Sequence, residues 1–184
     1  RLATAESSIT QLGNKITTEI SRVDSKIPTD FGSRNLILKS ADFSNVHSYT
    51  GRGNNIAIST DNASYIINSN GNSSNFWGGV SWNMAVSEIR AGETFSLLVP
   101  VYIDSGTDMS DGATVTIKNN LTNTIAFEYK IPTSVKDEWF DVALNFTHTR
   151  DVDLSEYPFG IYVVRNGHLK IKPPMLVRGA LIPL

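Results

Sequence analysis

Apolar side chains recur three or four residues apart along the first 27 residues of the chain. They are Leu2, Ala5, Ile9, Leu12, Ile16, Ile20, Val23 and Ile27. This spacing puts them on one narrow stripe of an α-helix, and a lone helix with so narrow a stripe is marginal in water unless another surface covers it. That surface could be the helix's own domain, but an isoleucine-rich seam favours a parallel coiled coil of three copies. We therefore predict that residues 1–28 form the coiled-coil neck of a homotrimer, ended by Pro28, with the leucine, isoleucine and valine positions at its interface.

From residue 34 onward the helical period disappears, and short apolar runs are separated by turn residues. The runs predicted to be strands are residues 35–39, 55–59, 64–68, 76–86, 94–104, 113–119, 124–130, 138–147, 159–164, 169–172 and 175–179. Turn sequences such as SNGNSS, RAGE and RNGH lie between them. About ten short strands at this spacing are typical of an antiparallel sandwich. We predict an all-β fold in which residues 29–184 form a jelly-roll β-sandwich head.

Strand alternation assigns the two tryptophans of the run 76–86 to opposite faces of a sheet. One face carries Val80, Trp82, Met84 and Val86, and the other carries Trp77, Gly79, Ser81, Asn83 and Ala85. Because the first set is apolar, we expect Trp82 to lie in the core and Trp77 to point outward. A register shift at the paired glycines before Val80 would reverse both directions. The alternation of the run 138–147 predicts that Trp139 also points outward.

An outward tryptophan needs something to cover it. A loop or a neighbouring subunit could do so, or the indole could be a platform for the apolar C–H face of a sugar ring. Amide, imidazole and guanidinium groups nearby would then bond the sugar hydroxyls. The polar stretch 43–55, expected to be a long loop, supplies such groups, although it could equally be a solvated loop. The candidate saccharide contacts are Trp77, Asn75, Asn83, His47, Tyr49 and Arg52, with Trp139 as second choice.

Composition and charge narrow the range of partners. The chain has 184 residues and a formal net charge of −2, which gives no general attraction to nucleic acid or to an anionic membrane. It contains no cysteine, so neither disulfides nor thiolate metal sites are available. No apolar run is long enough to span a bilayer. We expect a soluble fragment of a longer protein, with neither nucleic acid nor membrane as a partner.

Catalytic and metal-binding patterns are weak. His47, His148 and His168 lack the spacing of a zinc site, and we expect each of them in a loop or on the surface. The acidic turn 104–112 does not have the spacing of an EF-hand, so a hairpin turn is the simpler interpretation. A polysaccharide depolymerase would need two converging carboxyl groups, which the sequence alone does not reveal. We therefore expect binding without catalysis, and neither a cofactor nor a metal.

Three stretches carry a resemblance to a known group of proteins. GSRNLILKSADF (residues 32–43) is similar to the G-x-R-N-L-L-x-x-S-x-F opening of carbohydrate-binding-module-like domains in phage proteins. EIRAGETFSLLVPVYID (88–104) and LKIKPPMLVRGALIPL (169–184) are similar to a turn-and-strand and to the closing strand of the same domains. The chain thus resembles the C-terminal part of receptor-binding or tail-fibre proteins of siphophages that infect streptococci or other lactic acid bacteria.

The resemblance implies a trimeric head on a helical stalk at the tail tip of a virion, made in the bacterial cytoplasm and binding host cell-wall polysaccharide. Other phage tail or baseplate proteins would be further partners. It transfers no sugar-contacting residues, because these vary too much among such proteins. Two alternatives stay open: a structural tail-fibre or baseplate domain that never touches sugar, and a polysaccharide depolymerase.

Overall fold

The computed structural model describes residues 35–44, 47–49, 55–61, 63–74, 76–109 and 111–180 of the chain. The chain divides into two compact units, Arg1–Ser33 and Arg34–Leu184, and every described residue belongs to the second. The predicted neck at residues 1–28, with its trimer-interface stripe from Leu2 to Ile27, lies outside the described residues.

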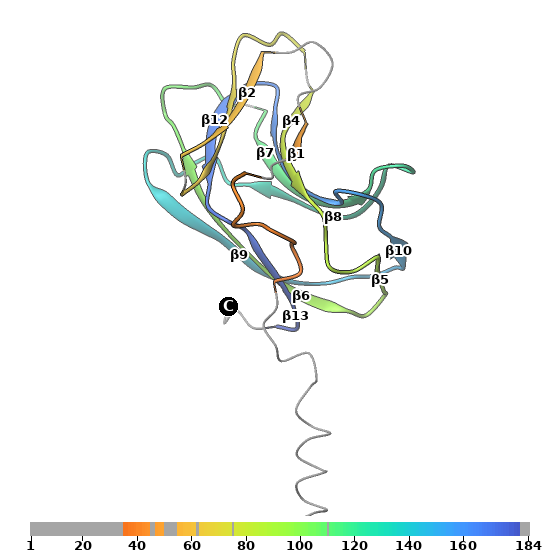
Figure 1. Ribbon diagram of the computed structural model, residues 1–184. Coiled ribbons are helices and arrows are strands. Elements are labelled where there is room, and N and C mark those ends of the chain that lie inside the picture. The colour runs from red at the N-terminus through yellow and green to blue at the C-terminus, as the bar shows by residue number, and fades with distance from the viewer. Residues whose placement is uncertain are drawn as a thin grey trace, which may run out of the picture. The chain divides into compact units, whose positions relative to one another are not determined.

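The strands of this unit form two antiparallel sheets and a small ribbon (Figure 1). The first sheet has the order β1 (His47–Tyr49), β4 (Trp77–Trp82), β11 (Phe159–Val164), β7 (Ala113–Asn119) and β8 (Thr124–Ile131). The second has the order β13 (Met175–Arg178), β6 (Thr94–Ile103), β12 (Gly167–Ile171), β3 (Tyr65–Ser69) and β2 (Ile56–Thr60), and β9 (Trp139–Thr147) also pairs with β6. The ribbon joins β5 (Glu88–Ile89) to β10 (Val152–Asp153). The chain passes repeatedly from one sheet to the other, which confirms the predicted all-β antiparallel sandwich.

The inward side chains of both sheets form one core. Val80 and Trp82 of β4 are 0% and 2% exposed, as their alternation predicted. The Trp82 ring lies 5.1 Å from that of Tyr65 in the second sheet and 5.8 Å from that of Phe159 in the first. At Gly78 the sheets approach so closely that a Cβ atom would lie 1.6 Å from the Ile56 side chain. A glycine is therefore required where β4 crosses β2.

Besides the short β5–β10 ribbon and the earlier end of β4 at Trp82, two segments differ from the prediction. Residues 35–39 do not form a strand; they make a single bridge, Ile37 to Met84, followed by a turn. The Asn35 side chain explains this, because it accepts hydrogen bonds from the Ile37 and Leu176 amides and holds the backbone in a local loop. Conversely, His47–Tyr49 is the edge strand β1, paired with β4, where we expected a long polar loop. Three residues are too short a run for alternation to be detected in the sequence.

The structure also corrects the prediction for His148. We expected a loop or surface position, but its side chain is only 4% exposed. The backbone of His148 bonds to that of Gly92 and Glu93, and its Nδ1 accepts the Arg150 amide at 3.1 Å. These contacts fold the segment after β9 against the turn before β6, so the burial comes from long-range pairing that no local pattern reports.

The opposite environments of two tryptophans predict different costs of truncation. Trp82→Ala should lower the free energy of unfolding by about 3–5 kcal/mol, because it leaves a cavity between the sheets. Trp139→Ala, at a residue 41% exposed on β9, should cost about 1 kcal/mol or less. Urea-induced unfolding of the two variants measures both values, and equal losses would contradict the assignment of Trp82 to the core.

Candidate functional site

The candidate site lies on the outer face of the first sheet, away from the core. The register aligns His47 of β1, Ser81 of β4, Gly160 of β11 and Thr116 of β7 in one row across four strands. The inward neighbours of these residues, such as Val80 and Ile161, are fully buried between the sheets. The row therefore lies on the face away from the core, and two of its members, His47 and Ser81, line a pocket there.

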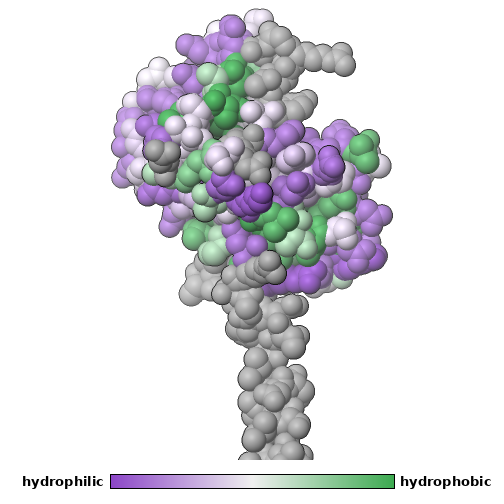
Figure 2. Space-filling view, in the orientation of Figure 1, coloured by the Kyte–Doolittle hydropathy of each residue, from purple (hydrophilic) through white to green (hydrophobic). Residues whose placement is uncertain are grey.

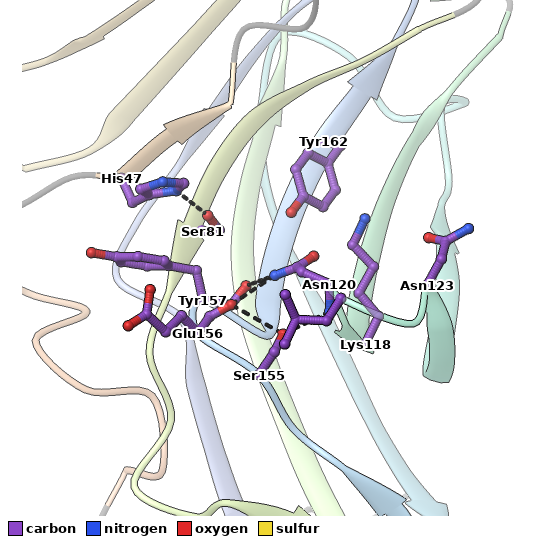
Figure 3. A pocket seen from close by; sticks show the side chains of 10 residues that line it. His47, Ser81, Lys118, Asn120, Asn123, Ser155, Glu156, Tyr157 and Tyr162 are labelled. Carbon is purple, nitrogen blue, oxygen red and sulfur yellow. Dashed lines mark hydrogen bonds between the residues drawn. The ribbon is translucent and has the colours of Figure 1, made fainter.

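The pocket has a volume of about 730 Å³ and lies between this face, the β7–β8 turn and the segment before β11. Its described lining consists of His47, Ser81, Lys118, Asn120, Leu121, Asn123, Ser155, Glu156, Tyr157 and Tyr162. Figure 3 shows His47 and Tyr157 on one side of the pocket, with Tyr162, Lys118 and Asn123 on the other. The lining mixes aromatic rings with hydroxyl, amide and charged groups, as pockets for polar ligands do.

One wall is a pair of stacked rings. The His47 and Tyr157 ring centroids are 3.8 Å apart and their planes differ by 15°. His47 Nδ1 is hydrogen-bonded to the Ser81 hydroxyl at 2.8 Å, which fixes the imidazole against β4. Because the imidazole is held from the strand and Tyr157 stacks on it, the two rings form a fixed aromatic surface.

Hydrogen bonds hold the segment that carries Tyr157. The Tyr157 amide donates to Asn83 Oδ1 at 2.8 Å, just beyond the end of β4. Asn120 Nδ2 donates to the Glu156 and Tyr157 carbonyls at 2.8 and 2.9 Å, and the Asn120 amide donates to Ser155 Oγ at 2.7 Å. Tyr157 has φ = 51°, a left-handed conformation that costs a non-glycine residue about 1–3 kcal/mol. The hydrogen bonds of the Asn83 and Asn120 side chains offset that cost and hold the loop in one conformation.

Tyr162 forms the other side of the pocket. A Cβ atom at Gly160 would lie 2.2 Å from the Tyr162 hydroxyl oxygen, so the ring folds back over the bare backbone of its own strand. The Trp77 ring meets it edge to face, with centroids 6.0 Å apart at 61°. Lys118 Nζ lies 5.5 Å from the Tyr162 centroid. Lys118 stands at a β-bulge between β7 and β8, a feature that commonly redirects a side chain.

The structure separates the sequence-predicted contact residues. His47 lines the pocket, Asn83 supports it from behind, and the half-buried Trp77 lies beside it against Tyr162. Tyr49 pairs with Gly79 through β1. Arg52 and Asn75 lie outside the described residues.

Trp139 lies on the other sheet. Its ring contacts Tyr102 on the outer face of that sheet, and Lys172 Nζ stands 4.5 Å from its centroid. It points outward as predicted, and Lys172 partly covers it. Trp139 and the pocket residues therefore do not form one site within the described domain.

Acidic side chains are few among the described residues that line the pocket. Glu156 is the one carboxylate among the described lining residues, whereas glycoside hydrolysis usually uses a pair. Two carboxylates of the acidic turn have partners within the fold: Asp104 is hydrogen-bonded to His168 Nδ1 at 3.2 Å, and Asp111 forms an ion pair with Arg165. Within the described residues there is no group of three acidic or histidine side chains that could hold a metal, and no helix long and apolar enough to cross a membrane.

Sequence reasoning missed most of the lining. The sequence could have predicted the direction of Tyr162 and Lys118. Both alternate with the core positions of their strands and must therefore face outward. No sequence pattern could have placed Glu156, Tyr157 and Asn120 at the pocket, since turn residues show no period and their spatial neighbours are distant in sequence.

The Asn83 contact generates a local prediction. Asn83→Ala should make the Tyr157 amide exchange with deuterium at least tenfold faster, a change of about 1.4 kcal/mol, because its acceptor is lost. The amide of the core residue Val163 should be unaffected by this local change. Asn68→Ala, at an exposed asparagine of β3, is the matched control. Unchanged exchange at Tyr157 would show that Asn83 does not hold the loop.

Similar structures share the fold of this domain. No protein-family model and no curated protein matches the chain. Among solved structures, a CBM4 protein superposes with a TM-score of 0.50 and 12% identity, over 73% of this chain and 85% of that one. The BiXyn10A CBM1 in its apo form gives 0.51 and 11%, over 73% and 90%. An arabinose-bound MgGH51 α-L-arabinofuranosidase gives 0.51 and 12%, over 79% of this chain but only 26% of the enzyme, so the chain spans about a quarter of that protein. The described domain thus has an antiparallel β-sandwich fold like that of carbohydrate-binding modules.

Proposed function

We propose that the pocket on the outer face of the first sheet binds a saccharide without cleaving it. The observation that carries this proposal is the stacked His47–Tyr157 wall, which faces amide and hydroxyl groups across a preformed pocket. A sugar ring has an apolar C–H face and a rim of hydroxyls, so it needs both kinds of surface. The likeness in fold to carbohydrate-binding modules supports the same interpretation.

Preorganisation makes such a site effective. Each hydrogen bond to a sugar hydroxyl replaces one to water and contributes only about 0.5–1.5 kcal/mol. The cost of ordering protein groups must therefore be small, and here Asn83 and Asn120 hold the loop in place by internal hydrogen bonds. Trp77 remains a candidate contact at the margin of the pocket, because its ring meets the ring of the lining residue Tyr162.

We further propose that the chain is a phage adhesin that attaches to host cell-wall polysaccharide as a homotrimer. The motifs at residues 32–43, 88–104 and 169–184 and the apolar stripe of residues 1–27 support this proposal. Three linked sites would raise the overall avidity about 10²- to 10⁴-fold above that of one site. Weak single contacts would then give firm attachment.

Two variants test the location of the site. Tyr157→Ala should weaken binding at least tenfold, because it removes half of the aromatic wall while leaving the core intact. Tyr102→Ala, at a partly exposed tyrosine on the second sheet, should leave the affinity unchanged. Affinity electrophoresis against a panel of soluble polysaccharides finds a ligand, and calorimetry with that ligand measures both affinities. Full binding by Tyr157→Ala would place the site elsewhere.

The oligomeric state tests the neck. The full chain should sediment as three copies, and a variant with Ile16→Asp and Ile20→Asp should sediment as one, because charges in the seam oppose association. The variant should keep the affinity of each site for soluble saccharide but lose at least a hundredfold in avidity for a saccharide-coated surface. An unmodified chain that sediments as a single copy would exclude the trimer.

A further inference from the structure

Lys118 is the lysine of the pocket, and its ammonium group lacks an acidic partner in the described part of the chain. The described ion pairs engage Arg90, Arg165 and Arg178. The Lys118 ammonium instead lies over the face of the Tyr162 ring, 5.5 Å from its centroid. A cation over an aromatic ring gains about 0.5–2 kcal/mol, which holds the group in position but leaves its charge available.

The position of Lys118 is unfavourable for a charged group. Its side chain is partly buried, and burial lowers the pKa of the amine from its ordinary value. A lowered pKa in the folded chain means that the charged form costs stability at neutral pH, and that this cost falls as the pH rises above the lowered pKa and is gone above the ordinary pKa of the amine. A charge kept at such a cost in a pocket is more typical of binding than of packing.

The positive and the negative side chain of the pocket lie on opposite sides of it. Figure 3 shows the Lys118 amine beside Tyr162 and Asn123, and the Glu156 carboxylate on the opposite side below Tyr157. One end of the pocket therefore favours an anionic group, and the other favours hydroxyl donors. A neutral sugar would leave the Lys118 charge uncompensated, whereas an acidic one would neutralise it.

We propose that the pocket selects acidic saccharides and that Lys118 determines this selectivity by pairing with a carboxylate or phosphate group of the sugar. The inference rests on the proposed function of the pocket and specifies its class of ligand. The aromatic wall contacts the ring of the sugar, and the amide and hydroxyl groups contact its neutral substituents. Charge-assisted hydrogen bonds to the ammonium group distinguish the acidic sugar from its neutral counterpart.

The experiment compares matched glycans on the full chain. One pair is a uronate-containing polysaccharide and its carboxyl-reduced form, and the other is a phosphate-bearing polysaccharide and its dephosphorylated form. Both pairs join an array of neutral glycans. We expect at least one acidic glycan to bind at least tenfold more tightly than its neutral counterpart, and the preferred pair identifies the anion. The preference should shrink when the salt concentration rises from about 0.01 to 0.15 M, because screening weakens the ion pair.

Three variants assign the preference to one residue. Lys118→Met should abolish it while keeping or raising the midpoint of thermal unfolding, and Lys118→Arg should retain most of it. Lys170→Met is the matched control, because Lys170 Nζ also lies 5.5 Å from a tyrosine ring, that of Tyr102 on the second sheet. This control should leave the preference unchanged.

The outcomes separate the two proposals. If the chain binds neutral and acidic glycans equally, or if Lys118→Met keeps the preference, the inference about Lys118 is wrong while saccharide binding stands. If no glycan of either kind binds, the proposed function of the pocket fails and this inference fails with it.

Discussion

The packing of two sheets through a single layer of inward side chains is the constraint on which the rest of this domain depends. Trp82 lies between Tyr65 of the second sheet and Phe159 of the first, and Gly78 lets Ile56 approach the backbone of β4. Because side chains alternate along a strand, fixing Val80 and Trp82 inward also fixes Ser81 outward. The candidate site is built on the residues that this packing leaves outside.

The outer face becomes a pocket only because loops close over one end of it. The β7–β8 turn supplies Asn120, and the end of β4 supplies Asn83, and both hold the segment before β11. Asn120 lines the pocket and Asn83 does not, and both shape it through these hydrogen bonds. The groups left to meet a ligand are the His47–Tyr157 wall and the side chains around Lys118.

The two outer faces of the sandwich differ in form, although both carry aromatic rings with lysines above them. On the second sheet, Trp139 and Tyr102 lie under Lys172 and Lys170. On the first sheet, loops enclose Tyr162 and Lys118 together with other polar groups. Figure 2 shows hydrophilic residues over much of one side of the molecule, with hydrophobic areas between them, so polarity alone does not locate the site. Enclosure and the arrangement of charge distinguish the pocket.

The sequence by itself determined the class of fold and the direction of side chains within strands. Alternation is a local property, so Trp82 could be assigned to the core and Trp139 to the surface before any neighbour was known. The tertiary structure alone decided which strands adjoin, that His47–Tyr49 forms an edge strand, that residues 35–39 form a bridge and a turn, and that His148 is buried. It also brought His47, Lys118 and Tyr157 to one pocket. Those outcomes depend on hydrogen bonds between residues far apart in the chain, such as Asn83 with Tyr157. The alternation of side chains along a single strand cannot predict such bonds.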